Sequence, residues 1–173
     1  PGRWMTVEFS NTSSAVWNSI QSALQESGFV VANVSALDKK QGSFKAVTTT
    51  TAVKQDLVIS TYKPSTQLEL NFTQRGDQAE GVWDFMEYHL KHLPVSKPRG
   101  GTLEFVAERD PRILYDRMVA FYIGHNTPVP LSSGEFQAAL DEKYPSRDGM
   151  VFLAEQVAEY DKMAAKMENS NSG

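Results

Sequence analysis

The chain opens with an alternation of apolar and polar side chains that is typical of a strand with one buried face. Residues 4–9 follow this pattern and are rich in β-forming types, so we predict a strand there. Residues 10–14 supply the serine, threonine and asparagine side chains that cap helix starts, and apolar residues then recur at helical spacing from Val16 to Phe29. Gly28 stands where a glycine commonly ends a helix. The pattern therefore predicts a strand followed by a helix.

Two further strands are indicated by short, continuous apolar runs. They occupy residues 29–34 and 56–62, and Pro64 stops the second. Runs of this kind suit strands that are covered on both faces. Strand, helix, strand and returning strand together predict a right-handed βαβ unit with an antiparallel strand added to it.

The second half of the chain has mostly helical periodicity. We predict helices over residues 77–93 and 155–167, and two more that begin at Asp110-Pro111 and at the capping box of Ser132 and Glu135. The segments between them are a linker at 96–101, a short strand at 102–106, a prolyl turn at 126–131, and an Asp148-Gly149 turn before the apolar run 150–153.

These elements predict an α/β fold class with a partial mixed sheet in the order β-α-β-β, followed by a mostly helical C-terminal region. We place the sheet in residues 1–75, the helical region in residues 76–168 and a disordered tail at 169–173.

Composition narrows the class of protein. A chain of 173 residues with 40% hydrophobic residues is long enough for a packed core. The absence of cysteine excludes disulfides, thiolate metal sites and a cysteine nucleophile, and with the lack of a secretory signal it favours a cytoplasmic protein. No apolar run approaches the ~20 residues of a membrane span, so we expect no membrane partner. A net charge of −4 means that any nucleic-acid contact requires a local basic patch.

One connection, residues 39–55, is positively charged although the chain as a whole is negatively charged. It contains many hydroxyl groups, no acidic residue and four lysines: Lys39, Lys40, Lys45 and Lys54. Lysines attract phosphates, and hydroxyls such as that of Ser43 hydrogen-bond phosphate oxygens. A connection of this length is uncommon in a compact domain unless it is functional or disordered. We therefore predict DNA contact by Ser43 and the four lysines. The alternative is a solvated β-hairpin, which a threonine-rich run also favours.

Other residues that can carry chemistry have structural explanations. His89 and His92 are one helical turn apart but lack a third ligand at a recognised spacing, so we expect no metal and place them at a helix C-terminus. Three arginines near Asp110 and Asp116 are expected to form surface salt bridges: Arg109, Arg112 and Arg117. Five aromatic residues at helical spacing are expected in the core: Trp17, Trp83, Phe85, Phe121 and Tyr122.

The segment from Ser133 onwards invites comparison with a helix-turn-helix motif. Its helix follows a prolyl turn, and the strand at Met150 would be the wing. The helix is acidic at Glu135, Asp141 and Glu142, which argues against DNA-groove reading and favours a packing or partner role.

Several stretches resemble the closing portion of bacterial site-specific DNA methyltransferases of the N4/N6-amino type, which are mostly adenine-directed. They are residues 2–9, 16–20, 37–45 and 53–59 in the first half, and in the second half the segment that runs from Phe121 through 129–132 to 148–150 and 155–161. The resemblance covers nearly the whole chain and rests on extended similarity rather than on a catalytic signature. It implies a methyltransferase-type sheet of seven strands. The strands here would be the fifth, sixth and seventh, the last inserted antiparallel between the other two.

The resemblance also implies motifs that this chain lacks. Such enzymes hold the amino group of the flipped base with an Asp/Asn/Ser-Pro-Pro-Tyr/Phe motif and hold S-adenosylmethionine with a glycine-rich turn. The chain has no Pro-Pro pair, and its one Gly pair, Gly100-Gly101, lies in the expected linker. We therefore assign no catalytic or cofactor-binding residue, and expect S-adenosylmethionine for the parent enzyme but not for this chain alone.

Two hypotheses for function follow. The first is the C-terminal portion of an S-adenosylmethionine-dependent DNA methyltransferase of the adenine type, giving structural support and DNA contacts through residues 39–55. The alternative is a non-catalytic DNA- or protein-binding module. The chain enters a strand almost at Pro1, which we interpret as a cut within a larger protein. The expected partners are then DNA, the upstream part of the same polypeptide, and a second copy bound through the exposed sheet edge.

Overall fold

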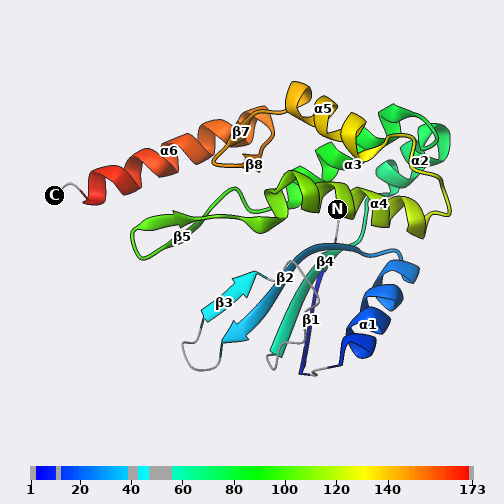
Figure 1. Ribbon diagram of the computed structural model, residues 1–173, viewed down its shortest axis with the longest axis horizontal. Helices are drawn as coiled ribbons and strands as arrows, with labels where there is room; N and C mark the ends of the chain where they lie inside the picture. Colours follow the sequence, from blue (N-terminus) through cyan, green and yellow to red (C-terminus); the bar gives the residue numbers. More distant parts are fainter. Residues whose placement is uncertain (1–2, 11–12, 39–42, 47–55, 172–173) are drawn as a thin grey trace.

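The protein has a mixed α/β fold in which a small sheet with one covering helix is followed by a mostly helical region (Figure 1). The computed structural model describes residues 3–10, 13–38, 43–46 and 56–171. The elements of the sheet part are β1 (Trp4–Ser10), α1 (Ser14–Glu26), β2 (Val30–Asp38), β3 (Ser43–Ala46) and β4 (Asp56–Tyr62).

The helical part contains five α-helices, one 3-10 turn and two short hairpins within residues 66–171. Its elements are α2 (Thr66–Arg75), α3 (Ala79–His92), β5 (Lys97–Arg99), β6 (Thr102–Glu104), η1 (Ala107–Arg109), α4 (Pro111–Gly124), α5 (Ser133–Lys143), β7 (Ser146–Arg147), β8 (Met150–Val151) and α6 (Ala154–Asn171). The last helix continues past residue 167, at which the sequence pattern placed its end.

The described strands of the main sheet have the order β1-β4-β2-β3. β4 pairs antiparallel with both β1 and β2, so β1 and β2 run in the same direction on either side of it. The prediction of a strand, a helix, a parallel strand and a returning strand is confirmed in this respect. The expected mixed sheet is not seen among the described strands, because the insertion of β4 makes every neighbouring pair antiparallel.

Local sequence explains where α1 ends and where α4 begins. α1 ends at Glu26, and Gly28 follows with a φ of 77°, a left-handed conformation that a glycine adopts without steric cost. α4 starts as predicted, because the Asp110 side chain accepts a hydrogen bond from the Arg112 amide and Pro111 occupies the first turn. The capping box of Ser132 and Glu135 at the start of α5 is also confirmed.

The two short hairpins turn on residues with positive φ. Gly100 and Gly101 have φ values of 55° and 82°, and they connect β5 to β6. Asp148 and Gly149 have φ values of 53° and 78°, and they connect β7 to β8. Two successive residues of this kind are typical of tight hairpin turns. The prediction of a linker at 96–101 was therefore wrong: the segment is one strand and the turn of a hairpin.

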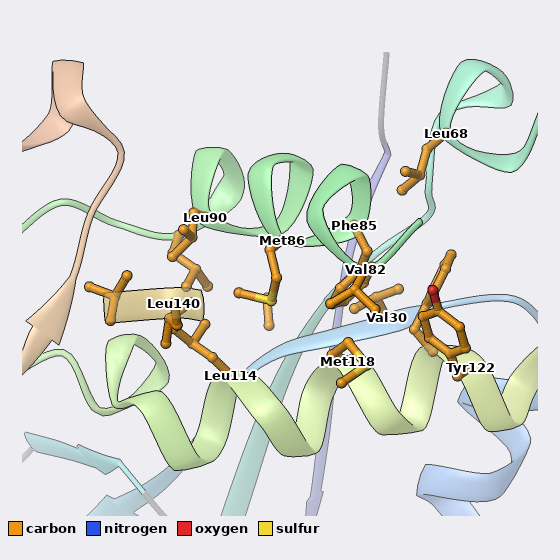
Figure 2. Close-up of a cluster of buried hydrophobic side chains, with 14 of the residues drawn as sticks. Val30, Leu68, Val82, Phe85, Met86, Leu90, Leu114, Met118, Tyr122 and Leu140 are labelled. Atoms are coloured by element: carbon orange, nitrogen blue, oxygen red, sulfur yellow. The ribbon is translucent and has the colours of Figure 1, made fainter. Parts of the chain in front are cut away.

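Two hydrophobic clusters cover the two faces of the main sheet. On one face, side chains of α1 pack on β2 and β4 in a cluster of Trp17, Leu24, Val31, Val34 and Ile59. On the other face, three sheet residues, Val30, Ala32 and Tyr62, join the large core that α2, α3, α4 and α5 build (Figure 2). Burial of apolar surface on both faces is the main force that holds the sheet to the helices.

The aromatic residues predicted in the core lie there. Trp17, Phe85, Phe121 and Tyr122 are buried. Trp83 is partly buried and stacks on Phe136, with ring centroids 5.6 Å apart.

α2 is a helix that the hydrophobic pattern does not predict. Its apolar residues Leu68, Leu70 and Phe72 alternate as in a strand. Only Leu68 and Phe72, four residues apart, are buried, whereas Leu70 is 52% exposed. Ser65 caps the helix by accepting a hydrogen bond from the Leu68 amide at 3.2 Å. The cap is a local signal of the helix, whereas the apolar alternation is not.

Candidate nucleic-acid interface

One edge of the main sheet gathers the chain segments in which a binding site is expected. Because β1 and β2 are parallel and β4 is antiparallel to both, the carboxyl ends of β1 and β2 share an edge with the amino end of β4. In α/β sheets, ligands bind outside the carboxyl ends of the parallel strands. We refer to this edge as the carboxyl edge.

The strand register places three residues at one level of the carboxyl edge. Ser10 of β1 and Leu37 of β2 both pair with Asp56, the first residue of β4. Asp56 is buried there. The ends of three strands therefore meet at Asp56, the first residue of β4.

The amino end of α1 lies beside this edge, because only residues 11–13 separate the helix from the end of β1. Ser13 is its N-cap residue, with extended backbone angles, and the first turn carries no acidic side chain. The first amides of a helix and its dipole favour an anion. An acidic residue in that turn would oppose such an anion, and none is present.

The residues predicted to contact DNA are placed only in part. Lys39, Lys40 and Lys54 lie outside the described residues. Ser43 and Lys45 belong to β3, where the backbone of Ser43 pairs with Asp38 and that of Lys45 with Ala36. Residues 43–46 pair antiparallel with β2, which is the pairing that the alternative prediction of a β-hairpin requires. These two positions therefore lie on an outer strand next to the carboxyl edge.

The opposite end of the sheet holds a cavity rather than a charged edge. Its volume is about 110 Å³, and it lies between the second half of α1, the start of β2 and α4. Arg117, His125 and Glu26 supply its charged walls, and Phe29 and Phe121 supply aromatic ones. These residues come from segments far apart in the chain, so no local sequence pattern predicts the cavity.

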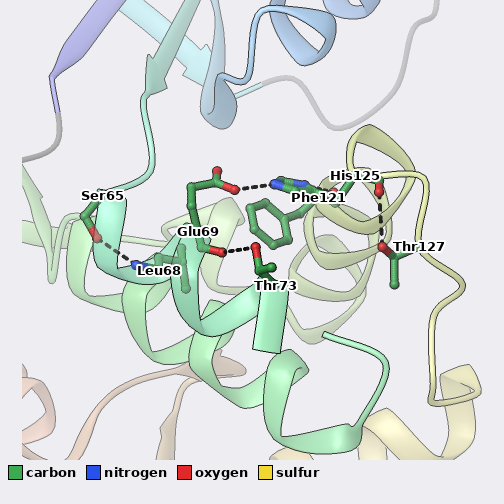
Figure 3. A network of polar contacts seen from close by, with 7 residues as sticks. All are labelled: Ser65, Leu68, Glu69, Thr73, Phe121, His125 and Thr127. Atoms are coloured by element: carbon green, nitrogen blue, oxygen red, sulfur yellow. Dashed lines mark hydrogen bonds and ion pairs between the residues drawn. The ribbon is translucent and has the colours of Figure 1, made fainter. Parts of the chain in front are cut away.

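Two of these side chains, His125 and Arg117, already have protein partners. Nε2 of His125 lies 2.6 Å from a carboxylate oxygen of Glu69, and its Nδ1 lies 2.8 Å from the Phe121 carbonyl oxygen (Figure 3). Both Nε and Nη2 of Arg117 donate to the buried carboxylate of Glu108 at 3.1 Å. These pairs tie α2 and η1 to α4, so they act as structural links.

The histidine pair in α3 differs from its prediction. His92 bonds the Tyr88 carbonyl at 2.7 Å near the helix end, as expected for a helix C-terminus. His89 is completely buried, and its Nδ1 lies 2.7 Å from the Tyr62 hydroxyl. Burial, as the largest cause, and the nearby charges of Arg117, His92 and Arg109 together lower the pKa of His89 to about 3. His89 is therefore neutral, and the expected interaction with the helix dipole was wrong for it.

The three arginines also differ from one another. Arg112 forms the expected exposed salt bridge with Asp110 at 3.2 Å, and Arg117 is paired with Glu108 rather than with Asp110 or Asp116. Arg109 is not on the surface at all. It is fully buried, and its guanidinium donates to the backbone carbonyls of two segments that lie on either side of it.

Side chains that could hold a metal do not come together in the part of the chain that the structure describes: no group of three or more His, Asp or Glu residues is found there. Among these same residues, no helix has the length and apolar composition that crossing a bilayer requires. Neither observation assigns a ligand to the carboxyl edge.

Comparisons with known proteins do not place the chain in a family: no protein-family model, curated protein or solved structure matches it.

Proposed function

We propose that this chain is the C-terminal portion of an S-adenosylmethionine-dependent DNA methyltransferase that acts on an adenine amino group. In this role it supports the catalytic part of the enzyme and contacts DNA through the connection of residues 39–55. The single observation that carries the proposal is the position of β4, antiparallel between the parallel strands β1 and β2.

The strand order supports the proposal because it departs from the arrangement that is most common for consecutive strands. A returning strand that follows β2 along the chain would commonly pair with β2 on its outer side, next to its neighbour in sequence. Instead β4 inserts between β1 and β2, and β3 takes the outer position. Insertion of the last strand between the fifth and sixth is the arrangement that the methyltransferase resemblance implies, so β1, β2 and β4 would correspond to those three strands.

The motifs that this chain lacks indicate which steps of the reaction it would leave to the rest of the enzyme. The chain contains no Pro-Pro pair and no glycine-rich turn between a strand and a helix, so base capture and cofactor binding belong to an upstream part. The residues of this chain would then bind and orient DNA and complete the sheet.

The carboxyl edge is the place where we expect DNA to lie. The α1 amino end carries no acid in its first turn, and the lysine-rich connection begins and ends at β2 and β4 on the same edge. Lysine side chains and the first amides of a helix both attract phosphates.

The helical part is less suited to DNA. α5 follows α4 and precedes the β7–β8 hairpin, in the order of a winged helix-turn-helix. Its exposed positions include Glu135, Asp141 and Glu142, which would repel phosphates. This observation favours a packing or protein-binding role for α5, as in the alternative hypothesis of a binding module.

The test of DNA contact is fluorescence anisotropy of a labelled duplex with the full chain over a salt series. The variant changes Lys39, Lys40, Lys45 and Lys54 to Ala. Each phosphate contact contributes about 0.9 to the slope of log K against log salt, so the four changes should reduce the slope by up to about 3.6. A matched control removes four lysines of the helical part instead: Lys91, Lys97, Lys162 and Lys166.

The control variant has the same net charge as the test variant, so equal losses of binding would show a general charge effect and overturn the DNA-contact role of residues 39–55. The enzyme origin has a separate test, which is the reading frame upstream of Pro1. A Pro-Pro-Tyr type motif there supports the methyltransferase. Its absence, together with binding to DNA, would leave the DNA-binding module.

A further inference from the structure

The cavity between α1, β2 and α4 has an apolar floor and a polar rim. The floor is formed by side chains that are at most 7% exposed: Val30, Val31 and Phe121. The rim is formed largely by polar side chains from the end of α1: Gln21, Gln25 and Glu26. A buried apolar surface with a few polar groups converging on it is the usual composition of a small-molecule site.

The three rim side chains of α1 are available to a ligand. Those of Gln21, Gln25 and Glu26 make no hydrogen bond or ion pair with another residue in the part of the chain that the structure describes. Each supplies an oxygen that accepts hydrogen bonds, from an amide in the two glutamines and from a carboxylate in Glu26. A protonated primary amine has three N–H donors and no acceptor. The donors of such an amine therefore match the acceptors of the rim in number and in kind.

The charges around the cavity favour a cation over an anion. Arg117 and His125 also line the cavity, but each is paired with a carboxylate, that of Glu108 and that of Glu69. The carboxylate of Glu26 is therefore left without a compensating charge among the described lining residues. In addition, α1 and α4 both end beside the cavity, and the carboxyl end of a helix carries partial negative charge.

A cation of the protein already lies next to the cavity. Nζ of Lys63 is 5.3 Å from the centroid of the Phe29 ring, and Phe29 lines the cavity. An ammonium group in this position is attracted by the face of the ring. Lys63 forms no ion pair with Glu26, so the carboxylate stays open to a second cation.

We propose that this cavity binds a small primary alkylamine in its protonated form. The ammonium group donates to Glu26 and to the amide oxygens of Gln21 and Gln25, and the alkyl part lies on the apolar floor. The cavity volume of about 110 Å³ limits the size of the alkyl part, because a cavity of about 150 Å³ holds one benzene ring. A branched chain of roughly five carbon atoms is therefore suitable. The cavity lies at the opposite end of the sheet from the carboxyl edge, so this proposal is independent of the proposed function.

Titration of the full chain at neutral pH, followed by NMR, is the first test, with isoamylamine as the ligand. Isoamyl alcohol carries the same alkyl group without a charge, and isovalerate is a branched anion of similar size. We expect isoamylamine to shift the side-chain amide signals of Gln21 and Gln25 with a millimolar dissociation constant. The alcohol should bind several-fold more weakly, and isovalerate should bind most weakly. If isoamylamine caused no shift, or if either analogue bound equally well, the proposal would be overturned.

Glu26→Gln tests the charge at the rim. Glu26 is exposed, so the change should leave the fold intact. It should weaken the binding of isoamylamine by up to about fivefold, as expected for an exposed ion pair, and leave that of isoamyl alcohol unchanged. Glu142→Gln is the matched control, because Glu142 is an exposed residue of α5 that does not line the cavity. Equal weakening in the two variants would show a general charge effect and contradict the role of Glu26.

Ala120→Leu tests the place of the alkyl part. Ala120 lines the cavity from α4, and a leucine side chain there would occupy the space that the alkyl part needs. Binding of isoamylamine should fall by at least about tenfold. Ala138→Leu makes the same change at an exposed position of α5 and should leave binding unchanged. Circular dichroism shows whether both variants fold, and if Ala120→Leu does not, Glu26→Gln decides alone. Unchanged binding by a folded Ala120→Leu variant would overturn the proposal.

Discussion

The hydroxyl of Tyr62 lies 2.7 Å from Nδ1 of His89, and both side chains are completely buried. Tyr62 is the last residue of β4 and His89 lies in α3, so this contact joins the sheet to the helical part. Nε2 of His89 has no hydrogen-bond partner among the described residues. Burial raises the pKa of Tyr62 and lowers that of His89, so both groups are neutral at neutral pH.

This contact predicts a loss of stability in acid. The pKa of His89 falls from 6.5 in the unfolded chain to about 3 in the folded protein, so the unfolded state binds the proton more readily. The stabilisation is fully present above about pH 6.5 and is lost as pH falls toward 3. Between pH 6.5 and about pH 5 the contribution of His89 is roughly 2 kcal/mol.

Urea unfolding at about pH 7 and about pH 5 measures this effect. His89→Asn keeps a polar group near Nδ1 but does not titrate, so its free energy of unfolding should depend less on pH than that of the unchanged protein. His92→Asn is the control, because His92 is only partly buried. If His89→Asn and the unchanged protein showed equal pH dependence, His89 would not be the cause of the stability loss in acid.

Arg109 is a buried cation that links α3 to the segment before α6. Its guanidinium donates to the carbonyls of Leu93 at 3.0 Å and Val151 at 2.9 Å, and it stacks on the Phe152 ring at 4.6 Å. Burial lowers its pKa to about 10, so it is still charged at neutral pH. Replacement by methionine would leave these carbonyls without donors.

We therefore expect Arg109→Met to reduce the free energy of unfolding by about 3 kcal/mol or more. Arg112→Met is the matched control. The Arg112 side chain is 89% exposed in its pair with Asp110, and its loss should cost within about 0.5 kcal/mol. Thermal unfolding of the two variants measures the difference, and similar melting temperatures would show that Arg109 is not the link described.

Gly100 and Gly134 form a pair for testing backbone conformation. A Cβ atom added at either position would meet no atom within 4 Å, so side-chain clashes play no part. Gly100 has a φ of 55°, whereas Gly134 lies in the first turn of α5. Gly100→Ala should cost about 1 kcal/mol. Gly134→Ala should stabilise the protein by about 0.5 kcal/mol. Chemical unfolding of both variants shows whether each change raises or lowers the free energy of unfolding. A stabilising Gly100→Ala would contradict the positive φ of Gly100 in the turn between β5 and β6.

Leu68 and Leu70 test the helical assignment of α2. Leu68 is 4% exposed in the large core and Leu70 is 52% exposed. Leu68→Ala should cost roughly 2–4 kcal/mol through the lost burial and the cavity that remains. Leu70→Ala should change the free energy of unfolding by less than about 0.5 kcal/mol. If α2 were a strand with one buried face, the two losses would be similar.

Much of the fold follows from local sequence because the interactions that decide it are local. The cap of Asp110 and Pro111, the capping box of Ser132 and Glu135, and the Asp148-Gly149 turn depend on residues within four positions of each other. Such contacts form the same way wherever the segment lies. These predictions were confirmed for that reason.

The sequence pattern made no prediction for the segment of α2, where a distant segment decided the outcome. The alternation of Leu68, Leu70 and Phe72 fits a strand, but packing against α3 and α4 selects the helix. Tertiary packing outweighs such weak local preferences.

The candidate site shows the same division. Three features follow from the order of the amino acids alone: the positive charge of residues 39–55, the order of β1, α1, β2 and β4, and the absence of the two methyltransferase motifs. Three others required the packed fold: β4 lies between β1 and β2, His89 contacts Tyr62, and Arg109 is buried. Each of these depends on contacts between residues distant in the chain, whose free energy exists only once the sheet and the helices have packed together.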